Sequence, residues 1–166
     1  MNRFILLAAK VLVCASALAM VNSAIGGDQV PFKGNLSLLS LPAPSNDGCP
    51  AGTERLNVTG GGYMTQMGAV TDQQFVCLNP SDFTFTGEFT LTAPSGDTVS
   101  ASLGGYAQPI SGPVFMVHGQ WTITGGTGRF GGATGAGIAT GPVNLATGEG
   151  THRLDGTISS VGSNVR

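Results

Sequence analysis

Hydrophobic and polar residues alternate in short runs along most of the chain, and this two-residue period is typical of β-strands. The clearest run spans residues 83–91, where phenylalanine and leucine at odd positions alternate with threonine and glutamate at even positions. No segment of useful length has the 3.6-residue period of a helix. The pattern predicts eight extended segments, at residues 30–41, 54–63, 69–78, 83–91, 99–103, 115–123, 133–143 and 149–159.

Composition supports an all-β fold. The chain contains 27 glycines, and a glycine inside a helix costs about 1 kcal/mol relative to alanine. Eight strands with short connections and one apolar face each predict an eight-stranded antiparallel up-and-down β-barrel, because closure leaves no exposed strand edge. A β-sandwich is the alternative. In either case we expect the following side chains to form the core: Phe83, Phe85, Phe89, Trp121 and Ile123.

The first residues have the character of a secretory signal peptide. Arg3 and Lys10 precede an apolar run over residues 11–21, and Ser23 and Ala24 supply small residues for cleavage. A transmembrane anchor is the alternative, but the run is much shorter than the roughly 20 residues that a spanning helix needs. We therefore expect residues 1–23 to be removed, residues 24–166 to form a single exported barrel domain, and the mature chain to carry no membrane anchor.

Charge and cysteine content limit the classes of binding partner and the cellular compartment that we expect. Lysine and arginine number 7 against 9 aspartates and glutamates, and no basic run exists, which argues against nucleic-acid binding. Cys49 and Cys77 flank the second and third predicted strands at the same end of a barrel. In an exported chain we expect them to form a disulfide. Two thiols without a nearby histidine indicate no metal site, and no cofactor is indicated.

One glycine-rich segment, Gly126-Thr-Gly-Arg-Phe-Gly131, matches the letters of a dinucleotide-binding fingerprint. That fingerprint requires a helix directly afterwards, whose N-terminus meets the pyrophosphate, whereas further glycines and a predicted strand follow here. We therefore expect a structural corner. Its glycines, Gly126, Gly128 and Gly131, would adopt positive φ, Phe130 would plug the barrel end, and Arg129 would bond to nearby carbonyls or a carboxylate.

The same segment, extended to residues 123–135, resembles the glycine corner of the allene oxide cyclase and dirigent-like barrels. Residues 60–68, 144–148 and 156–158 also resemble an exported and largely uncharacterised bacterial group with that fold. The resemblance covers most of the mature chain and implies a barrel that often assembles as a homotrimer. No catalytic residue of these families can be matched to this chain, so an activity would rest on fold analogy alone.

A candidate site follows from strand phase. Glu54 shares the phase of Leu56 and Val58, and His152 shares the phase of Leu154 and Ile158, so both side chains would face the interior. Their strands run in the same direction on either side of the first strand, which places the two residues about 10 Å apart at one rim. We expect Tyr106 to reach the same rim from across the barrel.

Two functions are compatible with these features. The first is a non-catalytic binding or structural module whose apolar interior holds an apolar small molecule. The second is an isomerase or cyclase that acts on a hydrophobic small molecule. An interior lined only by apolar side chains favours the first, whereas an inward acid or histidine with a perturbed pKa inside a cavity favours the second.

Overall fold

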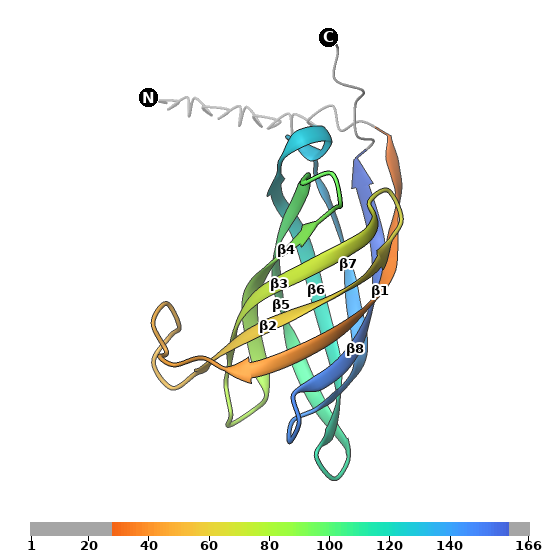
Figure 1. Ribbon diagram of the computed structural model, residues 1–166. Coiled ribbons are helices and arrows are strands. Elements are labelled where there is room, and N and C mark those ends of the chain that lie inside the picture. Colours follow the sequence, from red (N-terminus) through yellow and green to blue (C-terminus); the bar gives the residue numbers. More distant parts are fainter. Residues whose placement is uncertain (1–27, 160–166) are drawn as a thin grey trace, which may run out of the picture.

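The computed structural model describes residues 28–159, and the proposed signal peptide lies outside them. The described part of the chain forms eight strands and one short 3₁₀ helix (Figure 1). In chain order these are β1 (Gln29–Pro42), β2 (Glu54–Met64), β3 (Gly68–Leu78), β4 (Thr84–Thr92), β5 (Thr98–Ser111), β6 (Val114–Gly126), η1 (Gly128–Phe130), β7 (Gly135–Asn144) and β8 (Glu149–Ser159).

The strands close into a barrel in which each strand pairs antiparallel with its neighbours in sequence. Closure is made by β1 and β8, which pair from Gln29 opposite Ser159 to Leu39 opposite Glu149. The predicted up-and-down barrel is therefore confirmed, and the alternative sandwich is excluded. Within the described residues, no helix is long and apolar enough to cross a membrane.

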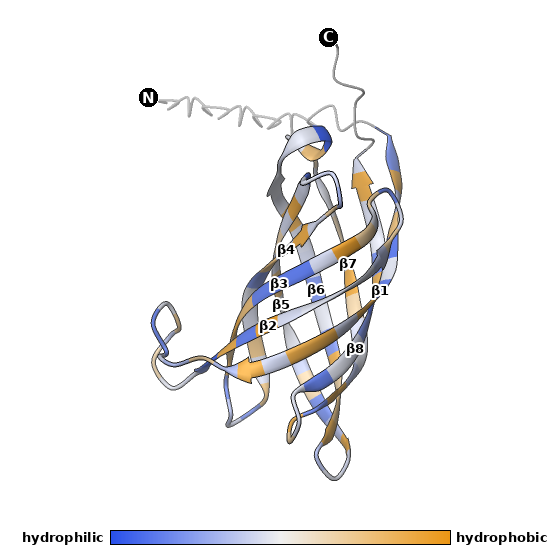
Figure 2. Cartoon of the chain, viewed as in Figure 1, coloured by the Kyte–Doolittle hydropathy of each residue, from blue (hydrophilic) through white to orange (hydrophobic). Residues whose placement is uncertain are grey.

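Buried and exposed positions alternate along much of each strand. Hydrophobic and hydrophilic residues both occur along the strands, as the hydropathy colouring shows (Figure 2). Four of the five expected core residues are buried, namely Phe85, Phe89, Trp121 and Ile123. The fifth, Phe83, is only partly buried. It precedes β4 with a positive φ of 57° and packs against Phe115, with ring centroids 4.8 Å apart.

One end of the barrel is closed by η1 and the turns beside it. Phe130, the residue expected to plug this end, is fully buried there. Arg129 donates a hydrogen bond to the carbonyl of Gln66 and lies 3.7 Å from the carboxylate of Asp97. These contacts tie the corner to the β2–β3 and β4–β5 turns.

The backbone conformations of the corner glycines agree only in part with the expected positive φ at Gly126, Gly128 and Gly131. Gly128 has a φ of 59°, but the second positive φ is at Gly132, at 76°, and Gly131 has a φ of −57°. Gly126 is needed for space, because a Cβ there would lie 2.5 Å from the carbonyl oxygen of Thr98. Two positions of the corner therefore need glycine because their φ is positive, and a third needs glycine because the neighbouring backbone leaves no room for a Cβ.

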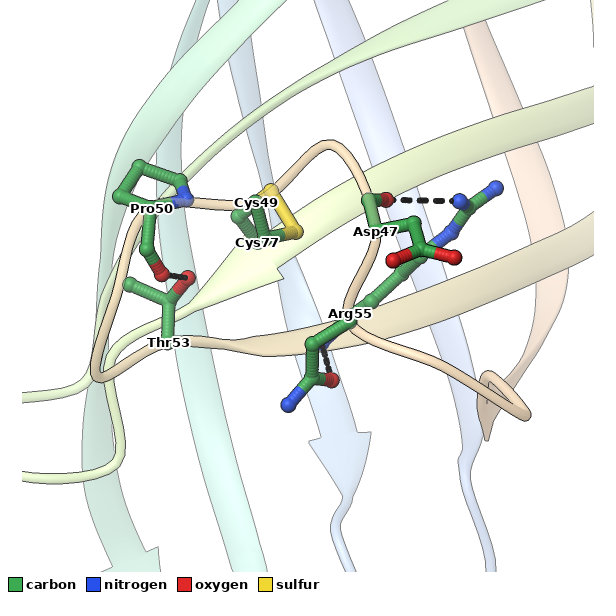
Figure 3. The surroundings of a disulfide bond; sticks show 7 residues. Asp47, Cys49, Pro50, Thr53, Arg55 and Cys77 are labelled. Carbon is green, nitrogen blue, oxygen red and sulfur yellow. Dashed lines mark hydrogen bonds between the residues drawn. A yellow bond between two sulfur atoms is a disulfide. The ribbon is translucent and has the colours of Figure 1, made fainter.

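The opposite end, which we call the mouth, is formed by the loops at 43–53, 79–83, 112–113 and 145–148. The longest of these is fastened to the outside of β3 by the expected disulfide between Cys49 and Cys77 (Figure 3). Arg55 supports the same loop, since its Nη1 donates a 2.9 Å hydrogen bond to the carbonyl of Asp47. Its guanidinium also lies 4.6 Å from the centre of the Phe75 ring.

Candidate functional site: a cavity at the mouth of the barrel

A cavity of about 310 Å³ occupies the mouth half of the barrel and reaches the mouth loops. Its wall is almost entirely apolar. Representative lining residues are Leu36, Val58, Val76, Phe85, Phe89 and Val117. Exposed Glu54 lies at its edge, so the cavity communicates with solvent. Its volume is at the lower end of the range found for small-molecule pockets.

The cavity exists because the inward-facing side chains differ in volume between the two ends of the barrel. Near the closed end the interior is filled by large buried side chains, among them Phe32, Trp121 and Phe130. Near the mouth the corresponding inward positions carry smaller residues, including Ala107 and Ala139. The strands therefore enclose a packed core at one end and a hollow at the other.

His152 projects into this hollow from β8, opposite Leu36 of β1. Its Nε2 is buried and has no hydrogen-bond partner among the described residues. Burial lowers the pKa of His152 from 6.5 to about 4, because a charged imidazolium would lose its hydration there. The imidazole is therefore neutral at neutral pH, so one ring nitrogen can donate a hydrogen bond and the other can accept one.

A second polar group lies on β3, where Asp72 and Gln74 both face the interior. Gln74 lines the cavity, and its Nε2 donates a 2.6 Å hydrogen bond to Oδ2 of Asp72. Asp72 is only 1 % exposed, and its Oδ1 has no hydrogen-bond partner among the described residues. Burial raises the pKa of Asp72 to about 6, although the hydrogen bond from Gln74 partly opposes the shift.

The structure brings together two of the three residues proposed from strand phase. Glu54 and His152 line the same cavity, the first at its edge and the second deeper inside. Their joint part in binding stays a prediction. The placement of Tyr106 is corrected: it is 50 % exposed on the outer surface, where its ring stacks on His118 at a centroid distance of 5.1 Å. Because side chains alternate, Tyr106 and the inward Ala107 necessarily face opposite sides of β5.

Sequence reasoning missed Asp72 and Gln74. The available signal was their phase, since both share the register of buried Val70 and Val76. That signal is weak because the alternate positions, Thr71 and Gln73, are polar as well. A strand with polar residues on both faces does not show from its own pattern which face is inside.

The residues between 28 and 159 contain no group of three or more histidine, cysteine, aspartate or glutamate side chains that could hold a metal ion. The segment that resembles a dinucleotide fingerprint forms the three-residue helix η1 followed by β7, as a structural corner requires. The long helix that a pyrophosphate site needs does not follow it.

Comparison with known proteins supports the architecture. No model of a known protein family matches the chain, and no curated protein matches it significantly. Among solved structures, the fold is similar to that of a pterocarpan synthase dirigent protein, with a TM-score of 0.50 and 14 % sequence identity. The similarity covers 86 % of this chain and 91 % of the dirigent protein. The chain therefore has the fold of a dirigent-like barrel.

Proposed function

We propose that this protein binds an apolar small molecule in the cavity at the mouth of its barrel. The observation that carries the proposal is the cavity itself: an apolar hollow, open to solvent, in a barrel that is otherwise filled by its own side chains. Transfer of an apolar molecule from water to such a wall is favourable by about 25 cal/mol for each Å² of apolar surface that is buried. The dirigent-like fold supports a barrel that serves as a container.

We further propose that the protein works outside the cytoplasm, after removal of residues 1–23. The Cys49–Cys77 disulfide is typical of oxidising environments and supports this location. Assembly as a homotrimer is an expectation that rests on the resemblance to dirigent-like barrels. Sedimentation equilibrium of the mature protein measures it directly.

The second candidate is an isomerase or cyclase of hydrophobic small molecules, and one observation favours it. His152 lies inside the cavity with its pKa shifted far below the usual value by burial. The neutral imidazole carries an unprotonated nitrogen that can accept a proton from a bound molecule, a step that many isomerisations require. Its lowered pKa makes it a weak base, so this transfer needs an acidic proton on the bound molecule. Asp72 does not itself line the cavity, so a direct proton transfer with a bound molecule would involve His152, or Glu54 at the edge.

The binding proposal is tested by titration with the neutral fluorescent probe N-phenyl-1-naphthylamine. The probe should gain fluorescence with wild-type protein. Ala107→Phe fills the cavity and should abolish the gain, whereas Gln108→Phe adds the same ring to the outer face and should leave it intact. Glu54→Gln and His152→Ala then show whether the proposed rim and wall residues contribute. Equal binding by the two phenylalanine variants, or no binding by folded wild-type protein, would remove the cavity as the binding site.

A further inference from the structure

The hydrogen bond between Gln74 and Asp72 gives the cavity a polar feature with a defined direction. Both residues face inward from β3, two positions apart, but only Gln74 reaches the cavity wall. Asp72 lies behind it and is almost fully buried. Its register neighbours on the flanking strands are Gly60 of β2 and Leu91 of β4, neither of which has a polar side chain. Gln74 is therefore the connection between a buried carboxylate and the cavity.

The carboxylate determines how the amide of Gln74 is turned. An ionised carboxylate only accepts hydrogen bonds, so the NH₂ group of Gln74 must face Asp72, as the 2.6 Å bond shows. Reversal of the amide would bring two acceptor oxygens together. The hydrogen bond to Asp72 uses only the Nε2 of Gln74, and Gln74 lines the cavity, so we infer that its Oε1 is available to a bound molecule. Because the amide donates to a charged group, its carbonyl is polarised and becomes a stronger acceptor.

We propose that Gln74, held in position by Asp72, accepts a hydrogen bond from a hydroxyl group of the bound molecule and so selects uncharged apolar alcohols over pure hydrocarbons and carboxylates. This inference rests on the proposed binding function and deepens it. Gln74 is the specificity-determining residue, and Asp72 is a positioning residue that acts through it.

The rest of the cavity wall agrees with this selection. None of the described lining residues is lysine or arginine, so a bound carboxylate would find no cation to compensate its lost hydration. Glu54 at the edge and Asp72 behind the wall would repel it. A pure hydrocarbon would fit the wall but leave the acceptor of Gln74 without a partner, which costs binding energy. An apolar alcohol can pack its hydrocarbon part against the wall and donate its hydroxyl hydrogen to the Oε1 of Gln74.

The test compares three probes that share one ring system: 2-naphthalenemethanol, 2-ethylnaphthalene and 2-naphthoate. The first two have nearly the same shape, and only the alcohol carries a donor. In a purely apolar cavity the hydrocarbon would bind more tightly, because the hydroxyl group must leave water. We expect the reverse for wild-type protein, with the alcohol about 5- to 10-fold tighter than the hydrocarbon, as one net hydrogen bond allows. Displacement of N-phenyl-1-naphthylamine measures all three.

Two variants assign the selectivity to residues. Gln74→Met removes the acceptor while keeping the length of the side chain, so the alcohol should lose its advantage and the hydrocarbon should still bind. Gln73→Met makes the same change one residue away on the exposed face of β3 and should retain the wild-type ratio. An unchanged ratio in Gln74→Met would overturn the proposal. If wild type binds alcohol and hydrocarbon equally, the inference fails and the binding function stands; if folded wild type binds neither, both fail.

Asp72 is tested by the pH dependence of the alcohol-to-hydrocarbon ratio. The titratable side chains that face the interior of the described strands are Glu54, Asp72 and His152. Between pH 7.5 and 5 we expect the ratio to fall in wild type, because a protonated Asp72 no longer requires the amide to face it. The ratio should be independent of pH in Asp72→Asn. It should keep the wild-type profile in Glu88→Gln, which removes an exposed carboxylate from the outer face of β4. A wild-type profile in Asp72→Asn would show that Asp72 has no positioning role.

Discussion

Gly137 leaves the space that the indole ring of Trp121 occupies: a methyl group on Gly137 would overlap the ring. The two residues are register partners on β7 and β6. The indole ring is fully buried, lies edge-on to Phe32 at a centroid distance of 5.9 Å, and donates from Nε1 to the carbonyl of Ile138 at 3.0 Å. This pairing of the largest side chain with the smallest one fixes the packing of the closed half of the barrel.

Substitution of this glycine should be costly. Gly137→Ala forces the indole and the adjacent backbone of β8 to move, and overpacking of this kind costs about 1–3 kcal/mol. Gly125→Ala, at the end of β6, places its methyl group in open space and should change stability by less than about 0.5 kcal/mol. Urea denaturation of both variants checks the difference. Equal stability of the two variants would show that the barrel relaxes around Trp121 without cost.

The register of β4 can be tested at two adjacent residues. Phe89 is 4 % exposed and packs edge-on against Trp121, so Phe89→Ala should cost roughly 3–5 kcal/mol. Thr90 faces outward and shares only a 3.1 Å contact with the hydroxyl of Ser100, so Thr90→Ala should cost at most about 1 kcal/mol. The midpoints of chemical denaturation give both values. A reversed order of the two costs would contradict the register.

The disulfide should contribute substantially to stability. Cys49 and Cys77 are separated by 28 residues, and a loop of this length corresponds to roughly 3–4 kcal/mol in the chain-entropy model. The double variant Cys49→Ala, Cys77→Ala should lose about that amount while keeping the barrel's circular dichroism spectrum. Intact mass with thiol labelling first establishes pairing in the wild type. Two thiols that react without reductant would refute it.

Asp72 and His152 should make opposing contributions to the pH dependence of folding. The raised pKa of Asp72 means that its carboxyl group favours folding below about pH 4, and this contribution is lost as the pH rises through about 6. The lowered pKa of His152 means that its contribution is present above about pH 6.5 and is lost as the pH falls through about 4. Each amounts to roughly 3 kcal/mol, so they nearly cancel between pH 4 and 6.

Single variants should separate these contributions. In Asp72→Asn, the free energy of unfolding should increase as the pH rises from 4 to 6.5, because only the contribution of His152 remains. In His152→Gln, it should decrease over the same interval. Urea denaturation at half-unit steps of pH measures the slopes. Parallel curves for the two variants would mean that at least one of the groups is hydrated in the folded protein.

The sequence was sufficient for the barrel but only partly for its interior. β8 was predicted with its observed bounds, Glu149–Ser159, because hydrophobic phase and flanking turns agree there. β5 is longer than predicted and continues to Ser111, since Gly104 and Gly105 interrupt the hydrophobic pattern without ending the strand. Hydrogen bonding to two neighbours holds such a segment in the barrel whatever its own propensity.

The same limits apply to the site. Phase alone placed Glu54 and His152 on the inner face, because apolar neighbours mark that face clearly. The inward Asp72 and Gln74 were missed, because their strand is polar on both faces and only pairing with β2 and β4 decides the register. The cavity was not predictable either. It depends on the summed volume of side chains from several strands, and no single segment carries that information.

Among the described residues, Phe130 and its neighbours close one end of the barrel, and the cavity reaches solvent at the other end. A bound molecule would then enter and leave through the mouth, and a second molecule could not displace it from the closed end. The rate of exchange between two ligands should then equal the dissociation rate of the first ligand and should not depend on the concentration of the second. Under the proposed binding function, this geometry suits retention of a bound molecule and not its passage through the barrel.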